Sequence, residues 1–181
     1  MALTKVKNFN YSRVRTGKAR NIINSKSFSF DVHYGEDEGP LLVQLPRSQV
    51  FSGLFESDGK FYCEILIPSD GAASRFYFEV AARIEASLKR QERFARSTFV
   101  GHVRVSSPES SCLRIKLPQN KANITTSLYS EGKDQRPGWD AFHKGAHIIP
   151  VVGIDHAYVV NNTIGFNLLL KEAVICSKMP P

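Results

Sequence analysis

The stretch KFYCEILIPSDGAASRFYFEVAARIEASLKRQER, residues 60–93, changes its hydrophobic period part-way along and thereby decides the fold. Residues 60–67 follow the turn signal Ser57-Asp58-Gly59 and predict one strand of a hairpin. Beyond Pro68, apolar side chains recur at four-residue spacing, at Phe76, Val80, Ile84 and Leu88. That spacing predicts an amphipathic helix of about five turns over residues 74–93.

Short strands are predicted on both sides of this helix. Residues 27–34 alternate apolar and polar side chains, and residues 41–45 form an apolar run that is typical of a strand buried on both faces. Residues 98–105 and 112–117 are predicted strands around a serine-rich turn, and 147–175 holds apolar runs broken at Asn161-Asn162. Many short strands around one helix predict a mainly β domain, either a small barrel or a sandwich, with the helix closing one end or side.

The first 30 residues carry all of the net positive charge. The chain has 24 bases and 17 acids, a formal net charge of +7, and no acid precedes Asp31. The remainder of the chain is therefore formally neutral. We expect residues 1–26 to form a basic flexible arm and residues 27–181 to form one β-rich domain. The bases of this segment are Lys5, Lys7, Arg13, Arg15, Lys18, Arg20 and Lys26.

Bases concentrated in one segment create a local positive field, so polyanions, and nucleic acid first, are the predicted partners. Neutralising phosphates with Lys and Arg releases counterions and gives salt-sensitive binding. Two aromatic rings among these basic residues provide stacking surfaces for unpaired nucleic-acid bases, at ~1–3 kcal/mol per nucleobase. A solvated tail or a localisation signal is the alternative. The predicted contacts are Lys5, Lys7, Phe9, Tyr11, Arg13, Arg15, Lys18 and Arg20.

The segment 98–117 is a second candidate for contact with nucleic acid. If its strands pair across the serine-rich turn, alternation places Arg104, Arg114 and Lys116 on one exposed face, with His102 beside them. A ladder of like charges destabilises a sheet unless an anion is present, which indicates a binding surface. The alternative is an ordinary solvated face whose charges are balanced by acids on neighbouring strands.

The segment 118–144 is predicted to be a long surface loop that mixes bases with aromatic rings, as oligonucleotide-binding loops do. Trp139 is the only tryptophan, and we interpret it as a core anchor beside Gly138. The predicted nucleic-acid contacts in this loop are Lys121, Tyr129, Lys133 and Arg136.

The sequence shows no arrangement typical of catalysis. Paired carboxylates, a phosphate-binding glycine loop and a nucleophile elbow are absent, so we expect a non-enzyme without a cofactor. His143 and His147 are four residues apart, but no cysteine or carboxylate cluster completes a metal site, so we expect no metal. Three scattered cysteines favour a reducing, intracellular compartment. We expect no signal peptide and no membrane span.

Four segments together carry a family resemblance that spans residues 27–175. They are GPLLVQLP at 39–46, then 60–67 with the following helix, then Trp139 shortly before Lys144-Gly145, and last IGF at 164–166 followed by 168–175. In this order they resemble the OB-fold single-stranded-DNA-binding proteins of nucleocytoplasmic large DNA viruses.

The resemblance implies an OB-fold barrel that coats single-stranded DNA during viral replication or recombination, without catalysis, in the cytoplasm or nucleus of the host cell. Single-stranded DNA, replication proteins and a second copy of the chain are the implied partners. The alternative is a small viral capsid or nucleocapsid protein with a jelly-roll body and a basic arm that faces packaged nucleic acid. The long helix between strands argues against a jelly roll. A third interpretation is an interaction module that carries a localisation signal and has no nucleic-acid role.

Overall fold

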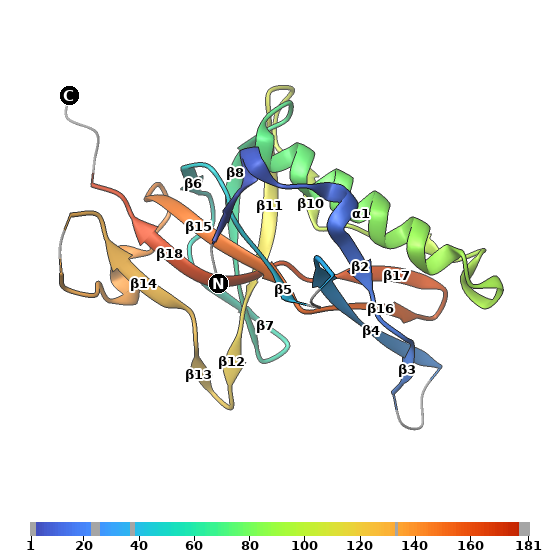
Figure 1. The fold of residues 1–181 in the computed structure, drawn as a ribbon. Helices are drawn as coiled ribbons and strands as arrows, with labels where there is room; N and C mark the ends of the chain where they lie inside the picture. Colours follow the sequence, from blue (N-terminus) through green and yellow to red (C-terminus); the bar gives the residue numbers. More distant parts are fainter. Residues whose placement is uncertain (1–2, 23–25, 37–38, 133, 178–181) are drawn as a thin grey trace.

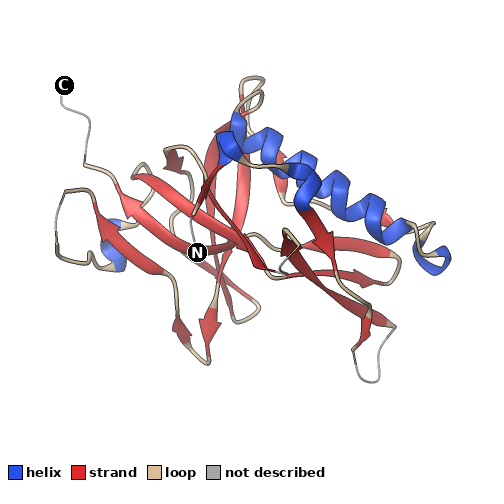
Figure 2. Ribbon diagram, viewed as in Figure 1, coloured by secondary structure: helices blue, strands red, loops and turns tan. Residues whose placement is uncertain are grey.

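The structure is a computed structural model that describes residues 3–22, 26–36, 39–132 and 134–177. It is mainly β with one long helix, as predicted (Figures 1 and 2). The strands before the helix are β1 (Thr4–Lys5), β2 (Val14–Thr16), β3 (Arg20–Asn21), β4 (Ser27–Tyr34), β5 (Gly39–Gln44), β6 (Ser48–Val50), β7 (Phe55–Ser57) and β8 (Lys60–Pro68). The strands after it are β9 (Thr98–Phe99), β10 (Val103–Val105), β11 (Ser110–Leu117), β12 (Gln119–Asn120), β13 (Asn123–Ile124), β14 (Ser127–Ser130), β15 (His147–Ile154), β16 (His156–Val160), β17 (Thr163–Phe166) and β18 (Leu169–Ile175). The helices are α1 (Ala72–Lys89) and the 3-10 turns η1 (Val6–Asn8), η2 (Tyr11–Arg13), η3 (Glu92–Phe94) and η4 (Trp139–Ala141).

Five strands close into a barrel in the order β8, β6, β15, β18 and β11, with β11 pairing back to β8. The longest of these pairings joins β11 to β8 antiparallel, with Arg114 opposite Glu64. The side chains that point inward from these two strands are fully buried, for example Ile65 and Leu113. The barrel interior is thus a packed apolar core rather than a channel.

The sheet continues beyond the barrel through β5, β4, β16, β17 and β9. This extension lies on the right of Figure 1, beneath α1. The hairpin of β16 and β17 turns at Asn161 and Asn162, whose φ angles of 48° and 61° are those of a type I′ turn, as the sequence indicates.

The helix α1 confirms the four-residue period of the sequence, because Phe76, Val80, Ile84 and Leu88 are all fully buried. It spans residues 72–89, and the chain then forms the separate turn η3 instead of continuing to residue 93. Its apolar side contacts the barrel strand β8 and the N-terminal strand β2, and Tyr77 on α1 contacts Phe166 of β17, so the helix packs against both the barrel and the sheet extension.

Two strand predictions are corrected. Residues 41–45 are not buried on both faces: Leu41 and Val43 are fully buried, whereas Leu42 is half-buried. The predicted strand at 98–105 is split into β9 and β10, because the chain crosses there from β17 to the barrel strand β11. The hydroxyl of Tyr77 on α1 accepts a hydrogen bond from the backbone N–H of His102 within this crossing, at 2.7 Å.

The basic segment differs most from expectation, because residues 3–21 pack on the body rather than forming a flexible arm. β1 pairs with β5, and β2 and β3 pair with β4. Phe9 is 7% exposed, and the centroid of its ring lies 4.7 Å from the ring centroid of Tyr34 and 5.0 Å from that of Phe76. Val14 is buried as well. Isolated apolar residues in a polar, basic run thus attach the segment to the core, which a search for long apolar stretches misses.

Candidate nucleic-acid interface

Half-buried rings and mostly exposed cations alternate on the outer side of β7, β8, β10 and β11, on the bend that precedes β7 and on the loop between η4 and β15. We call this surface the aromatic–cationic face, and its members are Phe51, Phe55, Tyr62, Arg104, Arg114, Lys116 and Lys144. It arises from strand alternation, because the neighbouring residues Cys63 and Ile65 point into the core and are fully buried. Burial raises the pKa of the Cys63 thiol to about 12, with a further contribution from the charge of Glu64.

The strand register fixes the neighbours on this face. Phe55 lies opposite Tyr62 across the β7–β8 hairpin, and their rings stack with centroids 5.8 Å apart and an interplanar angle of 26°. Tyr62 in turn lies opposite Lys116 of β11. Two rings and a cation therefore form a continuous row across three strands.

Guanidinium groups cover these rings. The Cζ of Arg114 lies 5.5 Å from the ring centroid of Phe55 and 5.8 Å from that of Tyr62. The Cζ of Arg104 and the Nζ of Lys144 each lie 5.6 Å from the ring centroid of Phe51. Each of these distances is within the range of cation–π attraction, so the cations are ordered over the ring faces.

Glu64 of β8 links the two arginines. Its Oε2 accepts from Nη2 of Arg104 at 3.0 Å and its Oε1 from Nη2 of Arg114 at 3.5 Å. The Glu64 side chain is 10% exposed, whereas the arginine side chains are 56% and 45% exposed. Arg104, Arg114 and Lys116 lie on one face, as predicted from strand alternation, and Glu64 is the neighbouring acid that the alternative interpretation required.

A pocket of about 210 Å³ opens beside this network, lined by Glu64, Gly101, His102, Val103, Arg104 and Arg114. Burial, followed by the positive charge of Arg114, lowers the pKa of His102. The imidazole is therefore neutral at pH 7, and its Nε2 has no hydrogen-bond partner in the part of the chain that the structure describes. The fixed charges of the pocket are thus two arginines and one carboxylate.

Burial shifts the pKa of Lys116, a member of the aromatic–cationic face, and that of Tyr158 on β16. Burial, and then the charge of Lys60, lower the pKa of Lys116. Burial, and then the nearby Tyr62, raise the pKa of Tyr158, which projects from β16. The ring of Tyr158 covers Gly165 so closely that a Cβ at that glycine would lie 2.6 Å from the ring, so a larger residue there would displace the tyrosine ring.

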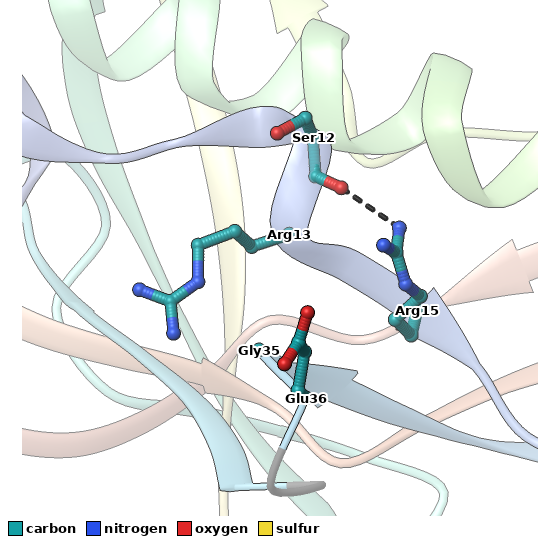
Figure 3. A pocket seen from close by; sticks show the side chains of 5 residues that line it. All are labelled: Ser12, Arg13, Arg15, Gly35 and Glu36. Carbon is teal, nitrogen blue, oxygen red and sulfur yellow. Dashed lines mark hydrogen bonds between the residues drawn. The ribbon is translucent and has the colours of Figure 1, made fainter.

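The predicted bases Arg13 and Arg15 lie at a separate basic pocket of about 430 Å³, which Figure 3 shows. The guanidinium of Arg13 lies 4.9 Å over the ring of Tyr34, and Arg15 donates to the Ser12 carbonyl at 2.8 Å. Glu36 also lines this pocket. Arg13 and Arg15 are therefore held in place by the pairing of β2 with β4 and by their own side-chain contacts.

The remaining predicted contacts of the basic segment are of mixed kinds. Lys5, Lys7 and Lys18 are exposed, and Arg20 forms an ion pair with Asp31. Phe9 is a correction, because its buried ring packs in the core and has no free face for a nucleic-acid base. Tyr11 is half-buried and contacts the edge of Phe9 at 5.2 Å, so only part of its ring is accessible.

The predicted loop at 118–144 contains three short strands and the turn η4. Lys121 is exposed, and the guanidinium of Arg136 lies 5.6 Å over the ring of Tyr129, which is 36% exposed. Lys133 lies outside the described residues. The half-buried Trp139 packs against Phe142 and the core, as predicted.

Within the described residues, no group of three or more His, Cys, Asp or Glu side chains is arranged to hold a metal ion. No helix in the described part of the chain combines the length and apolarity needed to cross a membrane.

Four residues of this site are not among the contacts predicted from the sequence: Phe51, Phe55, Tyr62 and Glu64. A signal for two of them was present: a two-residue turn at Asp58-Gly59 pairs Ser57 with Lys60 and therefore places Phe55 opposite Tyr62. Phe51 lies in a bend rather than a strand, so strand alternation does not place it.

No family model matches this chain, and no curated protein matches it. Among solved structures, it is similar to gp2.5, a single-stranded DNA binding protein encoded by bacteriophage T7, with a TM-score of 0.57 and 11% identity over 79% of this chain and 91% of that one. A single-stranded DNA-binding protein from bacteriophage Enc34 aligns with a TM-score of 0.48 and 8% identity over 94% of this chain and 98% of that one. The first similarity, together with the five-stranded barrel and the helix α1, shows that this chain has the OB fold.

Proposed function

We propose that this chain is a non-catalytic protein that binds single-stranded DNA without sequence preference. The observation that carries the proposal is the interleaving of stacked rings with guanidinium groups on one barrel face, above all Phe55 and Tyr62 with Arg114. The fold shared with a phage protein described as binding single-stranded DNA supports it. OB folds bind oligonucleotides on their barrel strands and adjoining loops.

The face explains why unpaired bases would be preferred. Every base has a π-face, so stacking on Phe51, Phe55 and Tyr62 stabilises any sequence. Bases in a duplex are already stacked on one another and do not offer these faces. Arg104 and Arg114 would then hold phosphates, releasing counterions and making the affinity dependent on salt.

The ordered basic segment would supply additional phosphate contacts. Arg13 and Arg15 face a pocket outside the aromatic–cationic face, and their positive field favours a fast encounter with a polyanion. Tyr129 and Arg136 form a smaller ring–cation pair, which would bind one further nucleotide in the same way. We propose that the chain acts in replication or recombination of DNA in a cell infected by a large DNA virus. Its partners there would be replication proteins or a second copy of the chain.

The capsid alternative is not supported by the fold. A jelly roll consists of eight strands in two packed sheets, whereas this body is a closed five-stranded barrel extended on one side. The basic segment, moreover, is paired with the body rather than free to extend into packaged nucleic acid.

The proposal is tested by fluorescence polarisation with labelled oligothymidine and a labelled duplex, each of about 20 units, longer than the site of one OB fold. We expect the single strand to bind at least about tenfold more tightly than the duplex. The logarithm of its affinity should fall linearly with the logarithm of the salt concentration, by about 0.7 per phosphate contact. Equal and weak affinity for both ligands would contradict the proposed function.

A further inference from the structure

In the free protein, the aromatic–cationic face is occupied by its own side chains. Arg114 lies over Phe55 and Tyr62, and Arg104 lies over Phe51. These are the ring faces that nucleic-acid bases would need for stacking. A ligand must therefore displace the guanidinium groups before it can use the rings.

Glu64 holds the guanidinium groups in this arrangement. Its carboxylate accepts from both arginines, one on β10 and one on β11. Its backbone is fixed on both sides, because the Glu64 N–H donates to Ser52 Oγ at 3.0 Å and its carbonyl accepts from the Phe51 N–H at 2.7 Å. It is the one carboxylate lining the pocket of Glu64, His102, Arg104 and Arg114 among the described residues. The carboxylate thus occupies a position beside the arginines that a phosphate would otherwise take.

We propose, resting on the proposed function, that Glu64 determines specificity by making this face select strands with unpaired bases over other polyanions. A phosphate alone reaches the arginines only if it replaces Glu64 as their anion, and the charge of this carboxylate, whose backbone is held by Ser52 and Phe51, opposes the exchange. A single strand recovers this loss, because its bases occupy the ring faces that the displaced guanidinium groups uncover. A duplex or inorganic polyphosphate offers charge without free bases.

The test compares Glu64→Gln with Glu56→Gln, measured by fluorescence polarisation against oligothymidine, duplex DNA and inorganic polyphosphate as competitor. Gln keeps the shape of Glu and removes its charge. Glu56 is exposed on the neighbouring strand β7, so the control makes the same charge change away from the arginines. We expect Glu64→Gln to raise the affinity for duplex and polyphosphate about tenfold and that for oligothymidine about twofold. The preference for single strands should therefore fall about fivefold, and Glu56→Gln should leave it unchanged.

Two outcomes would overturn the proposal. An equal effect of both variants would show a general charge effect, and a loss of single-strand affinity in Glu64→Gln would show that Glu64 only positions the arginines for the ligand. A wild-type protein that does not bind oligothymidine would refute the proposed function itself, which is a different result.

A measurement on the wild-type chain keeps the proposal testable if Glu64→Gln does not fold. The Nε–H resonances of Arg104 and Arg114 should shift strongly on addition of oligothymidine. They should shift little on addition of polyphosphate with the same number of charges, because polyphosphate does not displace Glu64. Equal shifts with both ligands would overturn the proposal.

Discussion

Replacing both Phe55 and Tyr62 by alanine is expected to lower the affinity for single-stranded DNA by about 100-fold or more, because stacking contributes ~1–3 kcal/mol for each base and both rings are removed. The two rings form one stacked pair across the β7–β8 hairpin, so the double variant also removes the surface over which Arg114 is held. Equilibrium fluorescence polarisation with oligothymidine measures the loss.

The control for this prediction is Phe78→Ala. The ring of Phe78 is 55% exposed on α1 and does not belong to the aromatic–cationic face, so this variant removes an aromatic ring, more exposed than Phe55 and Tyr62, from another surface. It should bind oligothymidine as the wild type does. A loss of less than about threefold in the double variant would show that stacking on this face does not supply the affinity.

Replacing Phe9 by alanine is expected to lower the free energy of unfolding by ~3–5 kcal/mol, the usual cost of deleting a buried phenylalanine ring. The ring contacts Tyr34, Phe76 and Tyr11, and it is 7% exposed. Urea unfolding, followed by the fluorescence of Trp139, measures the change.

Lys7→Ala is the matched control for Phe9→Ala, because Lys7 is an exposed member of the neighbouring turn η1. If Phe9→Ala were no more destabilising than this control, the segment would be a free arm after all.

The packing of Phe9 also determines which variants can test the charge of the basic segment. Deleting residues 1–26 would disturb the core, so substitution of Arg13 and Arg15 by glutamine is the cleaner way to remove their charge.

The local features of this fold could be predicted from the sequence. The four-residue period from Phe76 to Leu88 specifies α1, because a helix returns to the same face about every four residues. The Asp58-Gly59 and Asn161-Asn162 pairs specify hairpins, because these residues tolerate positive φ.

The long-range pairings were not predictable from the same patterns. The barrel closes through β6 with β15 and through β11 with β18, and no local signal specifies which distant strands meet. The basic segment packs on the body because the ring of Phe9 binds between Tyr34 and Phe76. That site exists only in the folded protein.

The candidate site shows the same division. Alternation along one hairpin is enough to place Arg104 and Arg114 on one face. Their ion pairs with Glu64 depend on the register of β8 against β11, in which Arg114 lies opposite Glu64 although the two are 50 residues apart in the sequence. A burial argument alone favours charged residues in solvent, so the buried acid that organises the face was the hardest feature to foresee.

The central claim is that single strands bind on the aromatic–cationic face, and photo-crosslinking tests it most directly. Oligothymidine containing 5-iododeoxyuridine is bound to the 181-residue chain and irradiated, and the crosslinked residues are identified by mass spectrometry. We predict that the crosslinks map to Phe51, Phe55 and Tyr62. Crosslinks concentrated on Phe78 of α1 or on Tyr129, with none on the three rings of the face, would contradict the account.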